Sequence, residues 1–502
     1  MSAVRHVAVV GRDAAAWLTA LALRRAFAGT GLEVTVVEMP SPLRPVDVFA
    51  AVPTLGALHR LIGLKEADVL PRTAGVPVLG QRFAGWSGQA SEFVHGYDTQ
   101  RPSIGDVEFL QFWVMARRHG MQVPYEEFSV AAAAAKQGRV SREDREAESL
   151  GDIAPGYHLD ARRYAGLLRA AALQLGVGHV AQPFAVEVEG ERVTGLALAD
   201  GGRIEADLYV DASGEEAVLR GRLPHGEWES WRAWLPCDRL LAASAPRLDP
   251  LPSFAHVAAF RAGWLGLYPL QNRTGIVAAY RSDAISDEEM VATASAVAGV
   301  RIGADAVLAK LDSGLRRRPW IGNCVTIGEG ALALDPLDAT ALHAIHVAVS
   351  HLISLFPVLA EEMPEADGYN IVVSAHAENL RDFTAAHYRL NQREGEPFWD
   401  AARAAPGPAS LDAKLSLFAA RGQVPLYDEE TFEIQNWAAI FIGHGVIPRD
   451  YTALVDALPQ AEAVQKFQNF LGAIADEVRA MPSVAQYLAQ GAAPKPERRG
   501  LY

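Results

Sequence analysis

The residues best placed to do chemistry form a short turn near the N-terminus, Gly11-Arg12-Asp13-Ala14-Ala15-Ala16. Their spacing follows the G-x-G-x-x-G turn that holds a dinucleotide pyrophosphate, and its third glycine serves helix packing, so Ala16 is tolerated. Asp13 replaces the second glycine, where a carboxylate adds bulk and negative charge facing an anion. Glu38 follows about 20 residues later, where such folds place an acid that binds a ribose hydroxyl. Two interpretations stay open: a working cofactor turn, or the relic of one.

The elements around this turn have the order of a dinucleotide-binding unit. "VRHVAVVG" is an apolar, β-branched strand ending at Gly11, and residues 14–28 form an Ala/Leu-rich helix. "LEVTVVE" is a second strand, ending at Glu38. Strand, helix and strand in this order predict two parallel strands with a right-handed crossover.

Two later segments are expected to return to the same sheet. "LYVDASG" is a strand followed by a turn, and Asp211 and Gly214 are expected to close the sheet. "CVTIGEG" places Gly328 and Glu329 after another strand, ahead of the amphipathic helix "ATALHAIHVAVSHLISL". An acid, a Gly-rich turn and a helix N-terminus together suit a polyol or phosphate ligand. After Pro357 the pattern is mostly helical, and no clean border separates the parts, so we expect them to be interleaved.

Composition excludes several classes of function. The chain has 502 residues, 50% of them hydrophobic, and a formal charge of −14, which argues against a nucleic-acid or anionic-membrane partner. Two cysteines give neither a disulfide framework nor a metal site, and His343 and His346 are interpreted as packing residues. No signal peptide or membrane-spanning run is evident. The sequence predicts a soluble, cytoplasmic protein without a metal.

A series of motifs carries a resemblance across nearly the whole chain. After "VVGRDAAAWLTALAL" come "LGQRFAGW", "LQFWVMARRHG", "YHLDARRYAGLLR", "DLYVDASG", "WLPCDRLL", "GWLGLYPLQNRTG", "RPWIGNCVTIGEGALALDPLDATAL", "RDFTAAHY" and "NWAAIFIGHGVIP". In this order they resemble the flavin-dependent tryptophan halogenase family. The resemblance implies a FAD domain of the monooxygenase type, interleaved β-rich substrate elements and a helical C-terminal part. It also implies reduced FAD supplied by a separate flavin reductase, and hypohalous acid carried through a tunnel to an aromatic substrate.

The family's catalytic positions carry over with changes. The lysine that precedes the L-G-x-x-F-x-x-W segment is Val78 here, and no lysine lies between Lys65 and Lys136. The E-S-T-G segment, which supplies a catalytic glutamate and shapes the halide site, reads from Asp338 to Ala341. Asp338 is therefore the candidate acid/base. Substrate or halide contacts are implied for Phe83, Trp86, Trp264, Pro269, Thr340 and Ala341.

The cofactor contacts carry over in the same way. In the G-W-x-W-x-I-P signature Trp264 is kept, and Gly266 replaces the second tryptophan. The flavin-contacting loop matches residues 48–51 in its alanine alone. The candidate cofactor-binding residues are Gly11, Asp13, Ala16, Trp17, Glu38, Asp211, Gly214, Gly328 and Glu329.

The expected architecture is an α/β, FAD-binding, doubly wound domain within residues 1–350, made of segments 1–40, 150–225 and 315–350. Segments 41–149 and 226–314 are expected to form the substrate-binding elements, and residues 351–502 the helical region. The predicted function is a halogenase-like oxidoreductase that uses reduced FAD and O2, with chloride or bromide as the candidate halide and without lysine-dependent halogenation; a homodimer is compatible with it. The alternatives are a non-catalytic paralogue that binds a small molecule or a protein, and, less favoured, a nicotinamide dehydrogenase.

Overall fold

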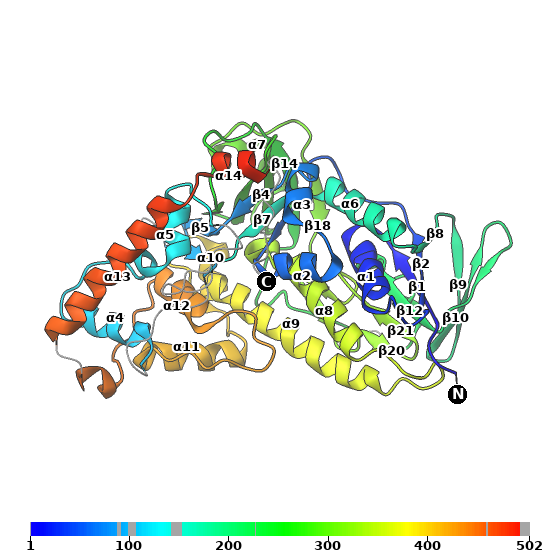
Figure 1. Ribbon diagram of the computed structural model, residues 1–502. Coiled ribbons are helices and arrows are strands. Elements are labelled where there is room, and N and C mark those ends of the chain that lie inside the picture. Colours follow the sequence, from blue (N-terminus) through cyan, green and yellow to red (C-terminus); the bar gives the residue numbers. More distant parts are fainter. Residues whose placement is uncertain are drawn as a thin grey trace, which may run out of the picture.

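A six-stranded, largely parallel sheet forms one half of the protein (Figure 1). The computed structural model describes residues 2–87, 92–98, 107–141, 153–225, 227–457 and 460–491. The sheet has the order β20 (Trp320–Ile321), β21 (Cys324–Thr326), β12 (Leu208–Ala212), β1 (His6–Gly11), β2 (Glu33–Glu38) and β8 (Gly178–Val180). All neighbouring strands run parallel except the β20–β21 pair.

The β1–α1–β2 unit confirms the element order predicted from the first forty residues. The helix α1 (Asp13–Ala26) follows β1 after a single residue, Arg12, and small or apolar side chains bury one side of it against the sheet. The helices α6 (Ala161–Gln174) and α8 (Ala341–Ser354) pack beside it. Because the strands are buried on both faces, they are runs of β-branched residues rather than alternating ones.

A second, seven-stranded sheet lies next to the first (Figure 1). Its order is β18 (Val307–Lys310), β14 (Arg239–Ala245), β17 (Thr274–Tyr280), β16 (Gly263–Pro269), β15 (Ala255–Phe260), β5 (Gly80–Ala84) and β6 (Phe93–Gly96). Only β15 and β5 pair in parallel. The helix α7 (Asp287–Ala298) packs on β15 and β16.

Smaller sheets complete the β structure. One joins β3 (Val48–Ala51), β7 (Gly156–Asp160) and β4 (Val76–Val78), and Val78 belongs to the same apolar cluster as residues in strands of the six-stranded sheet. Two more consist of β9 (Phe184–Glu189), β10 (Arg192–Leu198) and β11 (Arg203–Ile204), and of β13 (Trp228–Ser230), β19 (Gly314–Arg316) and β22 (Leu332–Ala333). The β9–β10 hairpin projects from the molecule in Figure 1.

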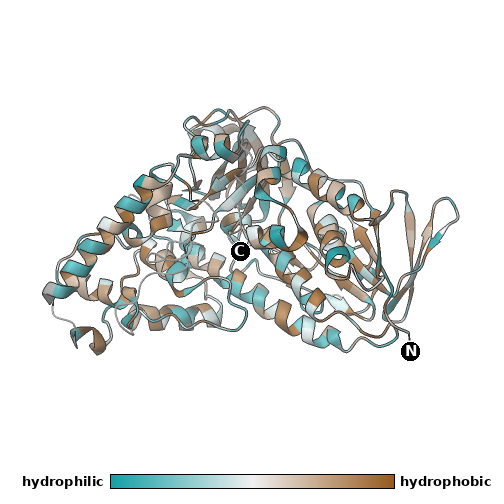
Figure 2. Cartoon of the chain, viewed as in Figure 1, coloured by the Kyte–Doolittle hydropathy of each residue, from teal (hydrophilic) through white to brown (hydrophobic). Residues whose placement is uncertain are grey.

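Helices dominate the C-terminal part, as predicted. The longest, α9 (Glu365–Leu390), runs from β20 to the helices α10 (Pro397–Ala404), α11 (Ala409–Arg421) and α12 (Ile434–Gly443) (Figure 1). The remaining helices are α2 (Thr54–Ile62), α3 (Glu66–Arg72), α4 (Phe109–Arg118), α5 (Val130–Lys136), α13 (Gln460–Ala480) and α14 (Val484–Gly491). Hydrophilic and hydrophobic residues alternate along α9 and α13 (Figure 2), as in helices with one face on a core.

The α/β fold class is thereby confirmed, with a helical C-terminal part. Strands of the six-stranded sheet come from three separate stretches of the chain, near residues 6–38, 178–212 and 320–326. No helix in the described residues is long and apolar enough to cross a bilayer. The finer division into cofactor and substrate segments stays a prediction.

Candidate functional site

The carboxyl ends of the parallel strands meet where the dinucleotide turn was predicted. Gly11, the last residue of β1, pairs with Ala212 on one side and with Glu38 on the other. Asp211 pairs in turn with Thr326, just before Gly328. Open parallel sheets bind ligands at this edge. The structure therefore brings the cofactor-binding candidates to one edge, from four strands far apart in the sequence.

Gly11 and Arg12 shape the floor of this edge. A Cβ on Gly11 would lie 2.1 Å from the Ala212 carbonyl oxygen, so only glycine fits between β1 and β12. The Arg12 guanidinium donates to the carbonyl oxygens of Ser213 at 2.7 Å and Pro40 at 3.2 Å, and pairs with Glu216. Its Nε is buried and has no hydrogen-bond partner among the described residues. Arg12 thus carries positive charge and a free donor at the turn.

Asp13 differs from the glycine it replaces in conformation as well as in charge. Its φ is +53°, a left-handed backbone that glycine adopts freely and that Asp adopts more readily than most other residues. Burial raises the pKa of its carboxyl, and Glu38 and Asp47 raise it further, whereas Ser41 and Arg12 lower it. A pyrophosphate at the N-terminus of α1 would meet this carboxylate, so Asp13 is the residue that fits an anionic ligand worst.

Gly214, Gly328 and Glu329 lie opposite the turn. Both glycines have a left-handed backbone, with φ of +80° and +85°, and a Cβ on Gly214 would lie 3.4 Å from Glu329 Oε2. The Glu329 side chain is exposed, yet the surrounding protein raises its pKa, first by desolvation and then through Glu215 and Asp13. A side chain that is both solvent-accessible and crowded by protein lies in a recess. Such a position suits an acid that binds a polyol.

The other cofactor-binding candidates are already occupied by protein contacts. Asp211 is fully buried and accepts hydrogen bonds from the Leu219 and Arg220 amides at 2.8 Å each, so it organises the loop after β12. Glu38 accepts one from His179 Nε2 at 2.7 Å. The side chains of Ala16 and Trp17 are buried in the core under the sheet. Arg169 Nε donates to the oxygen that His179 contacts, Glu38 Oε2, at 3.3 Å, so a ribose at Glu38 would share this carboxylate with two protein side chains.

The catalytic candidate Asp338 is buried and fully engaged. It ends a single 3₁₀ turn (Pro336–Asp338) ahead of α8, and it is 1% exposed. Its Oδ2 accepts a hydrogen bond from Thr384 Oγ1 at 2.7 Å, and its Oδ1 lies 3.1 Å from His387 Nε2. Thr384 and His387 are one helical turn apart on α9, so one face of that helix holds the carboxylate.

The residues after Asp338 behave differently from the expectation for a T-G amide site. The left-handed residue is Ala339, with φ of +59°, not Ala341, which begins α8 with helical geometry. Thr340 is the N-cap residue of α8, and its side chain makes no capping hydrogen bond. The replacement of glycine by Ala341 therefore introduces no backbone strain.

A second buried carboxyl group lies three residues earlier. Asp335 accepts hydrogen bonds from the Tyr388 hydroxyl at 2.6 Å and from Trp264 Nε1 at 3.2 Å. Burial raises its pKa to about 7, and the neighbouring Asp338 contributes to the rise, while Tyr388 opposes it. Cys237 Sγ lies 3.2 Å from the Tyr388 hydroxyl. Two carboxyl groups in one short segment, with different environments, are suited to hold different protonation states.

The predicted substrate aromatics form walls around His387. The Phe83 ring stacks on the His387 ring with centroids 4.6 Å apart, and Trp86 lies 5.6 Å from it. Phe83, Trp86 and Trp264 are at most 1% exposed. Pro269 ends β16 and accepts a hydrogen bond from a buried histidine through its carbonyl oxygen. In this structure these side chains are core residues that line the candidate site rather than an open cage.

Val78 has no solvent exposure and belongs to the same apolar cluster as Tyr97 and Ala339. Burial raises the pKa values of Tyr97 and Tyr268, and the charge of Asp338 raises both further. The Tyr268 hydroxyl is buried without a hydrogen-bond partner among the described residues, and its ring covers Gly266. Of these two tyrosines, Tyr97 is the one that shares the apolar cluster of Val78.

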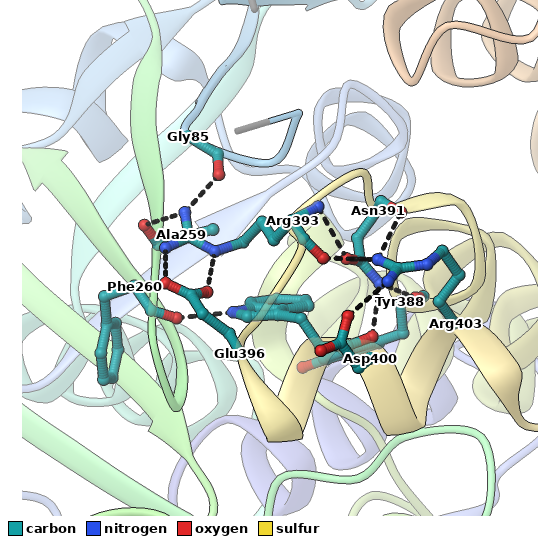
Figure 3. A network of polar contacts seen from close by, with 10 residues as sticks. Gly85, Ala259, Phe260, Tyr388, Asn391, Arg393, Glu396, Asp400 and Arg403 are labelled. Atoms are coloured by element: carbon teal, nitrogen blue, oxygen red, sulfur yellow. Dashed lines mark hydrogen bonds and ion pairs between the residues drawn. The ribbon is translucent and has the colours of Figure 1, made fainter. Parts of the chain in front are cut away.

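Two arginines fix the C-terminal end of α9 to the large sheet (Figure 3). Arg393 donates to the carbonyl oxygens of Gly85 and Ala259, at the ends of β5 and in β15. Arg403 donates to the carbonyl oxygen of Arg393 and to Asn391 Oδ1. The turn of α9 that holds Asp338 is thereby anchored at its far end.

Of the two histidines considered as metal ligands, His343 has hydrogen-bond partners, and His346 Nδ1 is buried without one among the described residues. The ring nitrogens of His343 are 2.8 Å from Thr54 Oγ1 and 3.0 Å from Thr431 Oγ1. Within the described ranges, no three His, Cys, Asp or Glu side chains gather as metal ligands would.

Sequence reasoning missed Asp335, Thr384, His387 and His444. His387 and Thr384 stand in the motif "RDFTAAHY", and their i, i+3 spacing was the available signal for a shared helix face. Nothing local connects either residue to position 338.

The fold and this site define the class of the protein. In structure the chain is similar to BrvH, a flavin-dependent halogenase from Brevundimonas sp. BAL3, with a TM-score of 0.91 and 31% identity over 98% of this chain and 99% of that one. It is equally similar to Xcc4156, a flavin-dependent halogenase from Xanthomonas campestris, with a TM-score of 0.91 and 27% identity over 99% and 100%. The chain therefore has the fold of the flavin-dependent halogenases.

The sequence comparison narrows the class to one family. The chain is 26% identical to tryptophan 7-halogenase KtzQ of Kutzneria sp. (strain 744), over 97% of this chain and 98% of that protein. The sequence model of the tryptophan halogenase family matches residues 6–460. The chain belongs to the tryptophan halogenase family, as its motifs indicated.

Proposed function

We propose that this chain is a flavin-dependent oxidoreductase that acts on a small aromatic or other organic substrate without a catalytic lysine, with Asp338 as its acid/base group. Family membership supports the use of FAD and of a separate flavin reductase. The single observation that carries the role of Asp338 is its position: it is a buried carboxylate held by Thr384 and His387, and the next residue, Ala339, belongs to the same apolar cluster as Val78.

Among the described residues, Lys414 is the one lysine that is buried. Lys414 has a buried ammonium group, but it donates to Glu430 at 2.8 Å and to the Pro425 carbonyl oxygen at 2.6 Å. Chemistry at this site therefore relies on carboxyl, hydroxyl and imidazole groups. Asp338 would hold or accept the proton that the substrate loses.

FAD would bind at the edge of the parallel sheet, where Gly11 lets β1 approach β12 closely and Gly214 and Gly328 form left-handed turns. Arg12, with its unpartnered Nε, would face the pyrophosphate, and Glu329 would bind the sugar-like chain of the flavin. When bound, reduced FAD would supply the reaction with O2 that oxidises a halide, chloride or bromide, or the substrate itself. Asp13 weakens this binding.

The test is a turnover assay with a flavin reductase, FAD, O2, bromide and then chloride, and a panel of small aromatic compounds. We expect a halogenated or oxygenated product in the mass spectrum, reduced at least a hundredfold in Asp338→Asn. The control is Asp312→Asn, a substitution at a carboxylate near the surface. Equal product from wild type and Asp338→Asn would contradict the role of Asp338. Absence of any product and of flavin binding would favour the non-catalytic alternative.

A further inference from the structure

Three buried side chains from three elements form an unbroken line that ends at Asp338. His387 Nε2 lies 3.1 Å from Asp338 Oδ1, and His387 Nδ1 lies 3.0 Å from His444 Nε2. Asp338 comes from the segment before α8, His387 from α9 and His444 from the end of α12. Each is at most 1% exposed. The line therefore uses both ring nitrogens of His387.

The two ends of the line differ. Asp338 Oδ2 is held by Thr384, so the carboxylate is fixed in orientation. His444 Nδ1 is buried and makes no hydrogen bond to any described residue, so the line is open at that atom. Phe93 lies edge-on to the His444 ring, with centroids 5.1 Å apart. Burial and the neighbouring His387 hold the pKa of His444 well below its usual range, so the ring is neutral at pH 7.

This arrangement has two proton distributions that keep both hydrogen bonds. In the first, His444 Nε2–H donates to His387 Nδ1, and His387 Nε2–H donates to the Asp338 carboxylate. In the second, one proton has bound at His444 Nδ1, and one has moved across each hydrogen bond, which leaves Asp338 protonated. Three bonds to hydrogen form and two break, so the net change is the one proton that entered. Neutral imidazoles convey protons in this way because each carries one donor and one acceptor.

We propose that His387 and His444 form a proton relay that exchanges protons with Asp338, with His444 Nδ1 at its far end. The proposal rests on the function assigned to Asp338 above. His387 and His444 are positioning residues, since they act through the carboxylate and not on the substrate. A purely structural role would need the two hydrogen bonds but not the proton movement, and this difference is measurable.

The first measurement uses the wild-type protein alone, labelled with 15N at histidine. With Asp338 ionised, the relay requires His387 and His444 to carry their protons on Nε2, and NMR distinguishes this from the Nδ1 tautomer. A proton on Nδ1 of either ring under these conditions would overturn the proposal. The measurement needs no flavin and no substrate, so its outcome is independent of the activity.

The second measurement follows the carboxyl band of Asp338 by infrared spectroscopy after a rapid pH jump. Asp335, Tyr97 and Tyr268 also face this group, so the band is assigned by its loss in Asp338→Asn. In His387→Gln the amide nitrogen replaces Nε2 and keeps the donor to Asp338, but it cannot pass a proton on. We expect the band to respond at least tenfold more slowly in His387→Gln and His444→Gln, and at the wild-type rate in His59→Gln.

An unchanged rate in both folded variants would overturn the relay. A different result would contradict the proposed function, namely an unchanged yield of product in Asp338→Asn. The relay itself is tested in the wild-type protein and in the two histidine variants.

Discussion

Val78 in β4 pairs with Gly156 in β7, and the Tyr97 ring closes over that glycine, 2.7 Å from where a Cβ on Gly156 would lie. The position of the family's lysine therefore holds a valine whose surroundings are filled by other side chains. An ammonium group there would be buried within an apolar cluster that includes Tyr97, Leu159 and Ala339.

We expect Val78→Lys to lower the free energy of unfolding by roughly 3 kcal/mol and not to restore chlorination by itself, because a buried unpaired charge is costly. Urea unfolding and the turnover assay measure the two effects. Val78→Met is the control, since it adds length without charge. Chlorinated product from Val78→Lys alone would contradict this account.

Asp13 provides a prediction on flavin affinity. Removing its negative charge should tighten FAD binding by one to two powers of ten, on the order of 1–3 kcal/mol. Asp13→Asn removes the charge and keeps a side chain suited to φ of +53°, whereas Asp13→Gly also relieves the backbone. If charge is the obstacle, both variants bind FAD about equally well in calorimetry. Unchanged FAD affinity in both folded variants would show that Asp13 does not hinder FAD binding.

The close approach of β1 and β12 allows a test of the strand packing at the candidate cofactor site. Gly11→Ala would place a methyl group 2.1 Å from the Ala212 carbonyl oxygen, so the strands must separate. We expect a loss of stability of about 2–4 kcal/mol in urea unfolding and loss of flavin binding. Gly29→Ala is the matched control, because nothing lies within 4 Å of its added Cβ. Equal stability of the two variants would refute the close packing.

The buried Asp335 predicts a pH dependence of stability. Its pKa is raised to about 7 in the folded protein, so the folded state keeps a proton that the unfolded chain has lost. This group therefore favours folding at low pH, and its contribution falls as the pH rises from about 4 to about 7, by on the order of 3–4 kcal/mol. Asp335→Asn should lack that decline, so the difference between the unfolding free energies of the two proteins should change with pH over this range. A difference independent of pH would contradict the raised pKa.

The sequence predicts the parts of this site that depend on local pattern. The β-branched run ending at Gly11 and the Ala/Leu-rich helix after it require a βαβ unit, and the strand ends at Asp211 and Thr326 follow from the same rules. The positive φ of Asp13 could not be read from its neighbours, although the glycine expected there was a sign of it.

Contacts between distant segments lie beyond such patterns. Asp338, His387 and His444 are separated by 49 and 57 positions and meet only when α9 and α12 pack. Likewise, His179 approaches Glu38 because β8 pairs with β2, so an acid predicted for a ribose has a protein partner. Local periodicity specifies each element but not which side chains of different elements face each other.

The central claim is that this chain still uses reduced flavin, and one measurement tests it most directly. The purified protein is titrated with chemically reduced FAD under nitrogen in a calorimeter, with oxidised FAD in parallel. The account predicts saturable binding of the reduced form in the micromolar range. No binding of either form up to near-millimolar flavin would contradict it, and the sheet edge at Gly11 would then be a structural remnant.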